Sequence, residues 1–540
     1  MLNKVAQTNT ISYREPLRLF EKSGPVDPEF HYYVPLDNVT NTDHQDIKTM
    51  LNRGRYFSIF APRQSGKTTF FRRLCDELHK DRTYIAIILD FETCQEFSKR
   101  RFYAYVEEGL YPQLTKRLKK LNCDKYETVQ QFLHSYRLTD HKSFGKLFIE
   151  LNQIIQSKKI IIFIDEFDGI PMKELGNFLT ALRTLYLQYK EEKKKALYSI
   201  GLVGIRNITK LIVGGVSPFN IADQVDMPPF SIKNVSDLYA QHTQESNQTF
   251  TEEAIKMVYE ETGGQPWLVN RLGTLLTHTI KPKSVEPITT EDVEKAIRIL
   301  LKERNNHFDN LDEKAKQYRE TLVEIIFDHV EYDPNVESQS WLEQYGLIKD
   351  CNGNAVVANN IYKTRYIKTL FKEVHPKYDI TTDQYDLPDN RLDMANVLLD
   401  FQQYIAQIGV KAFYLSKQKP SEKTGQFLLT VWLYQFTKSG LGDLRHEALS
   451  GLGRMDIILT YKGRKYVVET KINHQNDITR VLTQGVMQVS QQYLATESVD
   501  EGYLVIFDTK IPVGAACNPI EHQINHKKVI SFTIGIGRGK

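Results

Sequence analysis

The sequence predicts an α/β protein made of two successive α/β units, and three observations support this. From about residue 30 to 300, short apolar runs rich in β-branched residues alternate with helical stretches, as in a parallel sheet covered by helices. Residues 250–302 have a helical pattern throughout, apart from a break at "TGGQP". From about residue 380 the order is helix, helix, three strands, helix and strand, which predicts the second unit.

The first unit is expected to contain four strands, and the third of them precedes a long amphipathic helix, "MKELGNFLTALRTLYLQYKEE". The predicted strands are 56–61, 84–91, 160–167 and 198–205. In the second unit the last strand is expected at 503–508.

Residues 308–375 separate the two units and have a different pattern. A helix ending at Gly346, two short strands around an Asn352–Gly353 turn and a further helix predict a winged helix, and a plain helical spacer is the alternative. We therefore expect three domains, at 1–302, 303–378 and 379–540.

Composition narrows the class of protein. The 540 residues are 41% hydrophobic and 25% charged with a formal charge of +3, which is ordinary for a globular chain and too mild to indicate nucleic acid by itself. Five cysteines without a CxxC pair argue against a disulfide framework or a zinc site. Because no signal sequence and no run of about 18 apolar residues is visible, we expect a cytoplasmic protein without a membrane partner.

The stretch "FAPRQSGKTTF" (60–70) lies between a predicted strand and a helix and matches the phosphate-binding P-loop, with Ala61 in place of the usual first glycine. Gly66 allows the backbone N–H groups to curl around phosphate oxygens, Lys67 reaches the β- and γ-phosphates, and the Thr68 hydroxyl binds Mg²⁺. The predicted nucleotide-binding residues of this loop are Arg63, Gln64, Ser65, Gly66, Lys67, Thr68 and Thr69.

A second motif, "KKIIIFIDEFDGI" (158–170), places two carboxylates at the carboxyl end of a buried strand, where ligands bind in open α/β sheets. Asp165 is expected to hold Mg²⁺, and Glu166 to position or deprotonate the attacking water. An acidic pair after a strand is often only a solvated strand end. About a hundred residues after a P-loop, it predicts an ATP and Mg²⁺ site.

These two motifs, together with "SPFNIA" (217–222) and "ETGGQPWLVNRL" (261–272), resemble the bacterial AAA-like ATPases related to the STAND and Orc/Cdc6 groups, over about residues 15–300. The resemblance implies that Asn207 is the sensor-1 residue and Arg271 the sensor-2 residue of a helical lid. The alternatives are a turn residue for Asn207 and a surface helix charge for Arg271. Because "SPFNIADQ" has no arginine where a finger is usual, we expect a slow, switch-like ATPase, with homo-oligomerisation left open.

The segment "GRMDIILTYKGRKYVVETKI" (453–472) predicts a hairpin with strands over 455–461 and 464–472 and a Lys462–Gly463 turn. Paired residues then have numbers that sum to 925, so Asp456 faces Glu469. Side chains of directly opposed residues lie about 5 Å apart, and two carboxylates that close repel unless a cation lies between them.

Lys471 projects from the same face as Glu469, because side chains alternate along a strand. Two carboxylates and an amine at one point predict a divalent-cation site, and oxygen ligands favour Mg²⁺ or Mn²⁺. A simple Glu469–Lys471 ion pair on an edge strand is the alternative.

The arrangement resembles the PD-(D/E)XK nuclease superfamily over about residues 380–510, whose core has the same order of three strands, helix and strand. The resemblance implies that Asp456 and Glu469 bind metal, that Thr470 lends its main-chain carbonyl, and that Lys471 activates the nucleophilic water. Glu447 on the preceding strand is an expected extra ligand.

The predicted function is an ATP-binding and ATP-hydrolysing switch coupled to metal-dependent phosphodiester hydrolysis of nucleic acid, with DNA as partner. The alternative is a nucleotide-regulated DNA-binding or sensor protein whose nuclease-like domain is inactive. A third hypothesis, a motor that translocates DNA to the nuclease, has less support.

Overall fold

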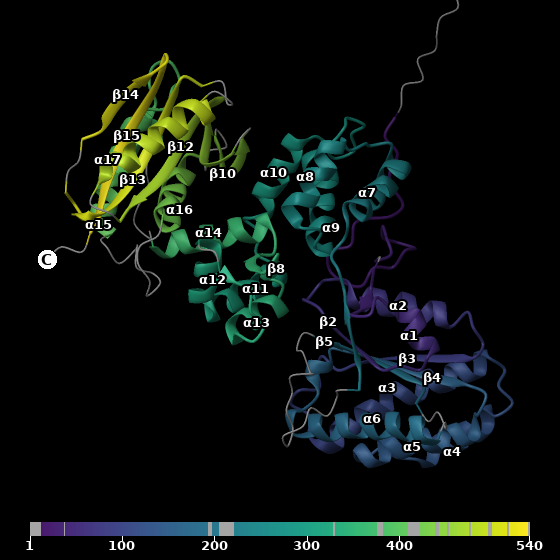
Figure 1. The fold of residues 1–540 in the computed structure, drawn as a ribbon. Coiled ribbons are helices and arrows are strands. Elements are labelled where there is room, and N and C mark those ends of the chain that lie inside the picture. Colours follow the sequence, from purple (N-terminus) through teal and green to yellow (C-terminus); the bar gives the residue numbers. More distant parts are fainter. Residues whose placement is uncertain are drawn as a thin grey trace, which may run out of the picture. The chain divides into compact units, whose positions relative to one another are not determined.

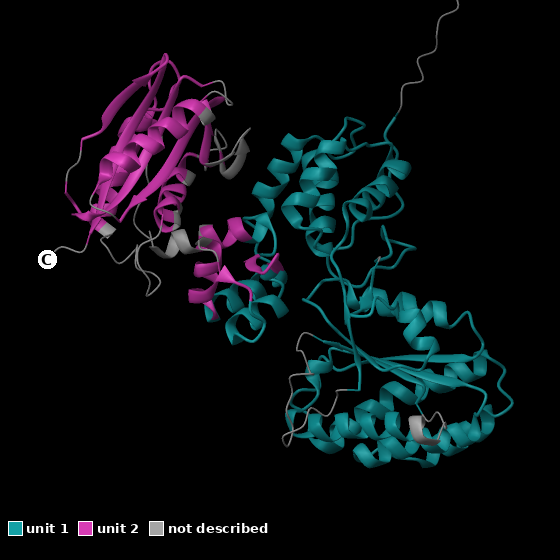
Figure 2. Cartoon of the chain, in the orientation of Figure 1, with its two compact units in different colours: residues 1–317, 333–349, 357–362 teal, residues 318–332, 350–356, 363–540 magenta. Residues whose placement is uncertain are grey.

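A computed structural model describes most of the chain and divides it into two compact units (Figure 2). Unit 1 comprises residues 1–317, 333–349 and 357–362, and unit 2 comprises 318–332, 350–356 and 363–540. The described residues are 12–36, 38–192, 197–204, 221–327, 330–374, 382–408, 422–437, 442–450, 453–474, 477–494, 499–515 and 518–537.

Unit 1 contains a six-stranded sheet in the order β1-β6-β2-β5-β4-β3. All neighbouring strands run parallel except β1, which is antiparallel to β6, so the sheet is mixed. The four predicted strands are confirmed as β2, β3, β4 and β5, and the short strands β1 and β6 were not predicted. Their bounds are β1 Thr40–Asn41, β2 Phe57–Phe60, β3 Tyr84–Asp90, β4 Lys159–Asp165, β5 Ser199–Gly204 and β6 Asp223–Asp226.

Helices cover both faces of this sheet (Figure 1). Alternation along the buried β4 explains why both faces are apolar: Ile162 packs with the helices α3 to α6, whereas Ile161 and Phe163 pack with α1 and α2. The helices are α1 Ile47–Asn52, α2 Lys67–Leu78, α3 Lys99–Lys120, α4 Tyr126–Ser135, α5 His141–Ile154 and α6 Met172–Glu192.

A helical group follows the sheet, as the pattern of residues 250–302 predicts. Its start is sharply defined, because the side chain of Ser231 caps α7 through Asn234 and that of Gln265 caps α9 ahead of Pro266 at the first helical position. The elements are α7 Ile232–Ser246, α8 Glu252–Thr262, α9 Pro266–Thr274, the π-helical turn η3 Leu275–Ile280 and α10 Thr290–Leu300.

Residues 306–374 contain the predicted helix, strand pair and helix, and contribute to both units. Gly346, with φ +74°, follows the helix α13, and Asn352 and Gly353 both have positive φ at the turn between β8 and β9. A third strand, β7, joins the sheet in the order β7-β9-β8. The elements are α11 Asn306–Gln317, α12 Arg319–Phe327, β7 Val330–Glu331, α13 Glu337–Gln344, β8 Ile348–Cys351, β9 Asn354–Val357 and α14 Asn360–Val374.

The C-terminal part of unit 2 is a second six-stranded sheet in the order β10-β11-β12-β13-β15-β14. The strand β11 is antiparallel to both of its neighbours, β10 and β12, whereas β12, β13 and β15 are parallel. The predicted order of helices and strands is confirmed, and β14 and β15 extend it. The elements are η4 Thr382–Tyr385, α15 Met394–Ile408, α16 Glu422–Leu433, η6 Tyr434–Thr437, β10 Gly442–Ser450, β11 Gly453–Tyr461, β12 Arg464–Asn473, α17 Ile478–Met487, η7 Gln488–Tyr493, β13 Glu501–Pro512, β14 Ile520–Ile524 and β15 Lys527–Gly537.

The expectations about cysteines and membrane-spanning segments can be compared with the described part of the chain. Cys75, Cys94, Cys123 and Cys351 are free thiols there. Among the described helices, none combines the length and the apolar character that crossing a bilayer requires.

Candidate functional site

The P-loop lies between β2 and α2. Gly66 occupies the N-cap of α2 with φ +92°, and Gln64 also has positive φ at +58°. These left-handed residues turn the chain back on itself at the start of a helix, where backbone N–H groups and the helix dipole attract anions. The loop therefore has the conformation that the motif predicts.

Lys67 is almost fully buried, at 5% exposure, and its ammonium donates hydrogen bonds of 2.7 Å to the carbonyl oxygens of Ala61 and Pro62. Burial lowers its pKa, and the nearby carboxylates of Glu166 and Asp165 oppose that shift. An incoming phosphate would give this ammonium an anionic partner in place of two neutral carbonyls.

Thr68 and Asp165 are brought into direct contact although they are far apart in the sequence. The Thr68 hydroxyl donates a 2.6 Å hydrogen bond to Oδ2 of Asp165, and the Glu166 N–H donates to Oδ1 at 3.0 Å. A hydroxyl beside a carboxylate at a phosphate loop fits Mg²⁺, which takes few protein oxygens and several from phosphate and water. Glu166 has φ +48°, and burial raises the pKa of its carboxyl.

A cavity of about 330 Å³ opens at this loop. Seven of the predicted residues line it, namely Arg63, Gln64, Gly66, Lys67, Thr68, Thr69 and Glu166. Ser65 instead lines an adjoining cavity of about 50 Å³, and its hydroxyl lies 3.9 Å from the Met227 sulfur. Carboxylate and cationic groups thus share one cavity with a phosphate-binding loop.

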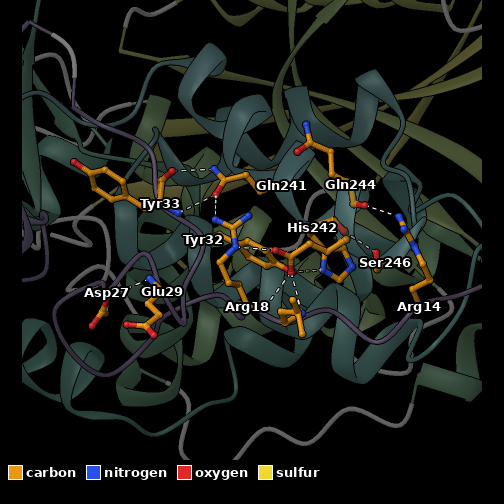
Figure 3. Close-up of polar contacts among 12 residues, drawn as sticks. Arg14, Arg18, Asp27, Glu29, Tyr32, Tyr33, Gln241, His242, Gln244 and Ser246 are labelled. Atoms are coloured by element: carbon orange, nitrogen blue, oxygen red, sulfur yellow. Dashed lines mark hydrogen bonds and ion pairs between the residues drawn. The ribbon is translucent and has the colours of Figure 1, made fainter.

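The sequence patterns missed the N-terminal strap, which we define as residues 12–36. Its residues 21–26 form part of the cavity wall. Polar contacts fix the strap to α7: Arg18 bonds Gln241 and pairs with Glu245 at 2.7 Å, and Tyr32 bonds His242 at 3.1 Å (Figure 3). No local motif marks these partners, because they lie more than 200 residues apart.

Two further attachments hold the strap beside the cavity. The Val26 N–H donates to the Thr69 hydroxyl at 2.9 Å, and the Trp267 indole N–H donates to the Lys22 carbonyl at 2.8 Å. The strap is therefore bonded both to the P-loop helix α2 and to the helix α9.

The two sensor candidates have different outcomes. Asn207 lies outside the described residues. Arg271 forms an ion pair with Glu303, in which its Nε lies 3.0 and 3.1 Å from the two carboxylate oxygens. Arg271 does not line the P-loop cavity. It lies instead in a neighbouring cavity with Trp267 and Lys22. A sensor role for Arg271 stays a prediction that requires it to leave Glu303.

The second candidate site is on the β11–β12 hairpin. The turn residues Lys462 and Gly463 both have positive φ, at +48° and +78°, as a two-residue hairpin turn needs. The strand partners run from Tyr461↔Arg464 to Ile457↔Val468, so the predicted register is confirmed over these five pairs. The next predicted pair, Asp456 with Glu469, is not among them and stays a prediction.

Asp456 lies just before these paired residues on β11, and its carboxylate accepts two hydrogen bonds from Thr470. Its Oδ2 accepts from the Thr470 N–H at 2.7 Å and from the Thr470 hydroxyl at 2.6 Å. Lys471 donates to Oε1 of Glu469 at 2.5 Å. The predicted residues are thus linked in two pairs at the end of the hairpin.

Glu469 is 1% exposed, and its Oε2 has no hydrogen-bond partner among the described residues. Burial, followed by the charge of Asp456, raises the pKa of this carboxyl to about 7. Burial lowers the pKa of Lys471, but Glu469 and then Glu422 outweigh it, so the net pKa is raised. A buried carboxylate oxygen without a donor is stabilised when a cation or a proton binds it.

Glu422, at the start of α16, is a residue of this site that the sequence patterns missed. Its Oε2 accepts from the Ile472 N–H at 3.1 Å, and its Oε1 lies 3.8 Å from the Lys471 ammonium. Burial raises the pKa of its carboxyl. The segment "SEKTGQF" gives no signal for this role, because the contact depends on how α16 packs on β12.

One observation limits how many side chains could bind a metal ion at this site. Across the described residues, no group of three or more His, Cys, Asp or Glu side chains lies close enough to hold a metal ion. Glu447 falls within β10, but its side chain is outside the described part of the structure. A cation here would rest on Asp456, Glu469, main-chain oxygen and water.

The mixed sheet, the P-loop and the Thr68–Asp165 pair define unit 1 as a P-loop ATPase-type domain. The model of the AAA-like domain family matches residues 21–369, and the chain belongs to this family. A second family model, described as a domain of unknown function (DUF8371), matches residues 393–510, which include the second site. No curated protein matches the chain.

Several solved structures are similar to part of this chain. The Walker-type ATPase PABY2304 of Pyrococcus abyssi is 14% identical, with a TM-score of 0.43, over 61% of this chain and 98% of that one. The RuvB Holliday junction branch migration motor of Thermotoga maritima is 14% identical (TM-score 0.31; 62% and 92%). Cdc6p of Pyrobaculum aerophilum is 12% identical (0.33; 60% and 91%). Likenesses this weak carry no argument about function.

Proposed function

We propose that this chain is an ATP-dependent switch fused to a metal-dependent nuclease that acts on DNA. The observation that supports the nuclease proposal is the buried Oε2 of Glu469, which has no hydrogen-bond donor among the described residues. The same carboxyl lies near the charges of Asp456 and Lys471. A core that only had to be stable would not keep such a group.

In the ATPase half, Lys67 and the N–H groups after Gly66 bind the phosphates, while Thr68 and Asp165 hold Mg²⁺. The cation neutralises charge on the phosphate oxygens when bound. Glu166 orients the attacking water, and its raised pKa makes it a better proton acceptor than an exposed carboxylate. These roles are supported by the cavity that Lys67, Thr68 and Glu166 share.

In the nuclease half, Asp456 and Glu469 provide carboxylate oxygens, and the Thr470 carbonyl and Glu447 are further proposed ligands of Mg²⁺ or Mn²⁺. Such a cation polarises the phosphoryl oxygen and lowers the pKa of bound water. Lys471 places an ammonium where negative charge develops on the scissile phosphate and orients the water. Asp456 also orders Thr470 through two hydrogen bonds.

A second candidate function is a nucleotide-regulated DNA-binding or sensor protein with an inactive nuclease-like domain. The observation that favours it is the absence, within the described residues, of a group of three metal-ligating side chains. In this alternative, Glu469 and Lys471 form a structural ion pair.

Nicking of supercoiled plasmid with Mg²⁺ or Mn²⁺ separates the two. The wild type is expected to nick and Lys471→Ala is expected to lose activity. Lys465→Ala, which replaces an exposed lysine on the same strand, is the control and keeps it. Equal activity of wild type and Lys471→Ala favours the inactive-domain alternative.

Gating by ATP is tested with Lys67→Ala in the same assay. If ATP controls cleavage, the variant loses the ATP dependence that the wild type shows. An unchanged ATP dependence contradicts the switch.

A further inference from the structure

Trp267 contacts both the P-loop cavity and a second buried ring. It lines the nucleotide-sized cavity, at 8% exposure, and its indole is stacked on the imidazole of His307 with 4.3 Å between ring centroids and 23° between planes. A group entering the cavity therefore meets a side chain that is already packed against a second buried ring.

His307 also contacts the start of α14. Its Nε2 lies 2.7 Å from the hydroxyl of Tyr362, which is 2% exposed and in the first turn of that helix. The Tyr362 N–H donates to the Asn359 side chain at 2.9 Å, which fixes the helix start. These groups are buried, so breaking one of their hydrogen bonds would leave a polar atom unpaired at a cost in free energy. A displacement of the His307 ring is therefore expected to displace the Tyr362 hydroxyl with it.

A second contact links the segment between α8 and α9 to the residues before α14. Gly263, at the end of α8, has φ +56°, and a Cβ at this position would lie 3.0 Å from the Ala358 carbonyl oxygen and 3.3 Å from the Asn359 side chain. The "TGGQPW" loop thus touches the residues before α14 at one end and carries Trp267 at its other end.

Helix α14 links the two units by its own continuity. Its residues up to 362 belong to unit 1, and its residues from 363 belong to unit 2 with the C-terminal sheet. A helix transmits a displacement of its first turn along its length, since its backbone hydrogen bonds make it rigid.

We propose that Trp267, His307 and Tyr362 form a relay that reports occupancy of the P-loop cavity to α14. The proposal rests on the proposed function of this cavity as the ATP site. The relay requires ATP to contact Trp267 more favourably in one position of the indole than in another, because only such a differential interaction shifts an equilibrium between two conformations. Trp267 and Tyr362 are positioning residues in this scheme, because neither touches the reacting phosphate.

The test is amide hydrogen exchange of the full-length chain with and without ATP and Mg²⁺. In the wild type, ATP is expected to slow exchange in residues 363–374 by about fivefold, the equivalent of about one hydrogen bond's net contribution. Tyr362→Phe removes the hydroxyl and leaves the ring, so the ATP-induced change is expected to vanish while the Kd for ATP stays within about twofold.

His307→Phe loses the same hydrogen bond and keeps a ring against Trp267, so it is the second variant. Tyr198→Phe is the matched control: this tyrosine is 1% exposed and its hydroxyl donates to the Asn52 carbonyl at 2.6 Å, away from α14. The control is expected to keep both ATP binding and the change in α14.

The outcomes are distinct. Loss of the change in both variants with retained ATP binding supports the relay, and its persistence in either overturns it. A wild type that binds ATP without any change in α14 overturns the relay and leaves the ATP site standing. A wild type that does not bind ATP overturns the proposed function and the relay together.

Discussion

The hydroxyl of Thr68 donates a 2.6 Å hydrogen bond to Oδ2 of Asp165, which joins the first turn of the P-loop helix to the carboxyl end of strand β4. The two residues come from motifs about a hundred positions apart. Their contact supports a shared Mg²⁺ function more directly than either motif does, because both oxygens reach one point at the carboxyl edge of the sheet.

Replacing Thr68 by valine, which has the same shape, tests this function. We expect the affinity for ATP in the presence of Mg²⁺ to fall roughly 10–100-fold, since a hydrogen bond or ligand bond to a charged group contributes about 1.5–3 kcal/mol. ATP binding without Mg²⁺ should change much less. Calorimetry with and without Mg²⁺ measures both, and Thr180→Val, which replaces an exposed threonine of α6, is the control. Equal losses with and without the cation would contradict a metal role.

Gly169 should tolerate no side chain. A Cβ there would lie 1.8 Å from the Phe91 carbonyl oxygen, which belongs to the backbone and cannot rotate away. We expect Gly169→Ala to lower the free energy of unfolding by about 3 kcal/mol, the upper end of overpacking costs. The shift also moves the loop that carries Glu166, so ATP hydrolysis should fall as well.

Gly145→Ala is the matched control for this substitution. Gly145 lies in α5, and a Cβ added there would have no neighbouring atom within 4 Å, so alanine should raise the free energy of unfolding by up to about 1 kcal/mol. Urea denaturation of both variants gives the comparison. Similar effects of the two substitutions would contradict the close contact at Phe91.

The raised pKa of Glu469 predicts how stability depends on pH in metal-free buffer. Its carboxyl has a pKa of about 7 in the folded chain and an ordinary value of 4.5. Between these values the folded chain keeps a proton that the unfolded chain has released. The free energy of unfolding should therefore fall as pH rises from about 4.5 to 7, by about 3 kcal/mol for this group.

Glu469→Gln removes this titration, so its unfolding free energy should change less between about pH 5 and pH 8 than that of the wild type. Urea midpoints with EDTA at the two pH values measure the difference. Adding Mg²⁺ or Mn²⁺ at the higher pH should raise the midpoint of the wild type and leave that of Glu469→Gln nearly unchanged. Parallel pH profiles for the two proteins would show that Glu469 titrates normally.

The sequence predicted the parts of this molecule that depend on local patterns. Alternation and turn chemistry placed the hairpin register, because a Lys462–Gly463 turn leaves only one pairing of the flanking strands. The P-loop was equally local, since Gly66 and Lys67 act within one turn of backbone.

Features that depend on packing between distant segments were not predictable. The strap reaches the cavity only through bonds such as Trp267 to Lys22, and no pattern near either residue indicates the other. The ion pair of Arg271 with Glu303, which places this arginine in a neighbouring cavity, could not be read from the sequence, and its sensor role stays a prediction. The strand β15 and the edge strand β14 lie beyond the segment that the resemblance covers.

Glu422 provides the most specific test of the second site, because the structure alone brought it there. Its Oε2 accepts from the Ile472 N–H, and a glutamine can keep that bond while it removes the charge near Lys471. Losing one negative charge beside this site is expected to weaken cation binding by about 1 kcal/mol, so the Mg²⁺ concentration for half-maximal nicking should rise roughly fivefold in Glu422→Gln. Glu521→Gln, which replaces a 68% exposed side chain in the same unit, should leave it unchanged. If Glu422→Gln shows the Mg²⁺ dependence of the wild type, the glutamate only anchors α16 to β12 and takes no part in the site.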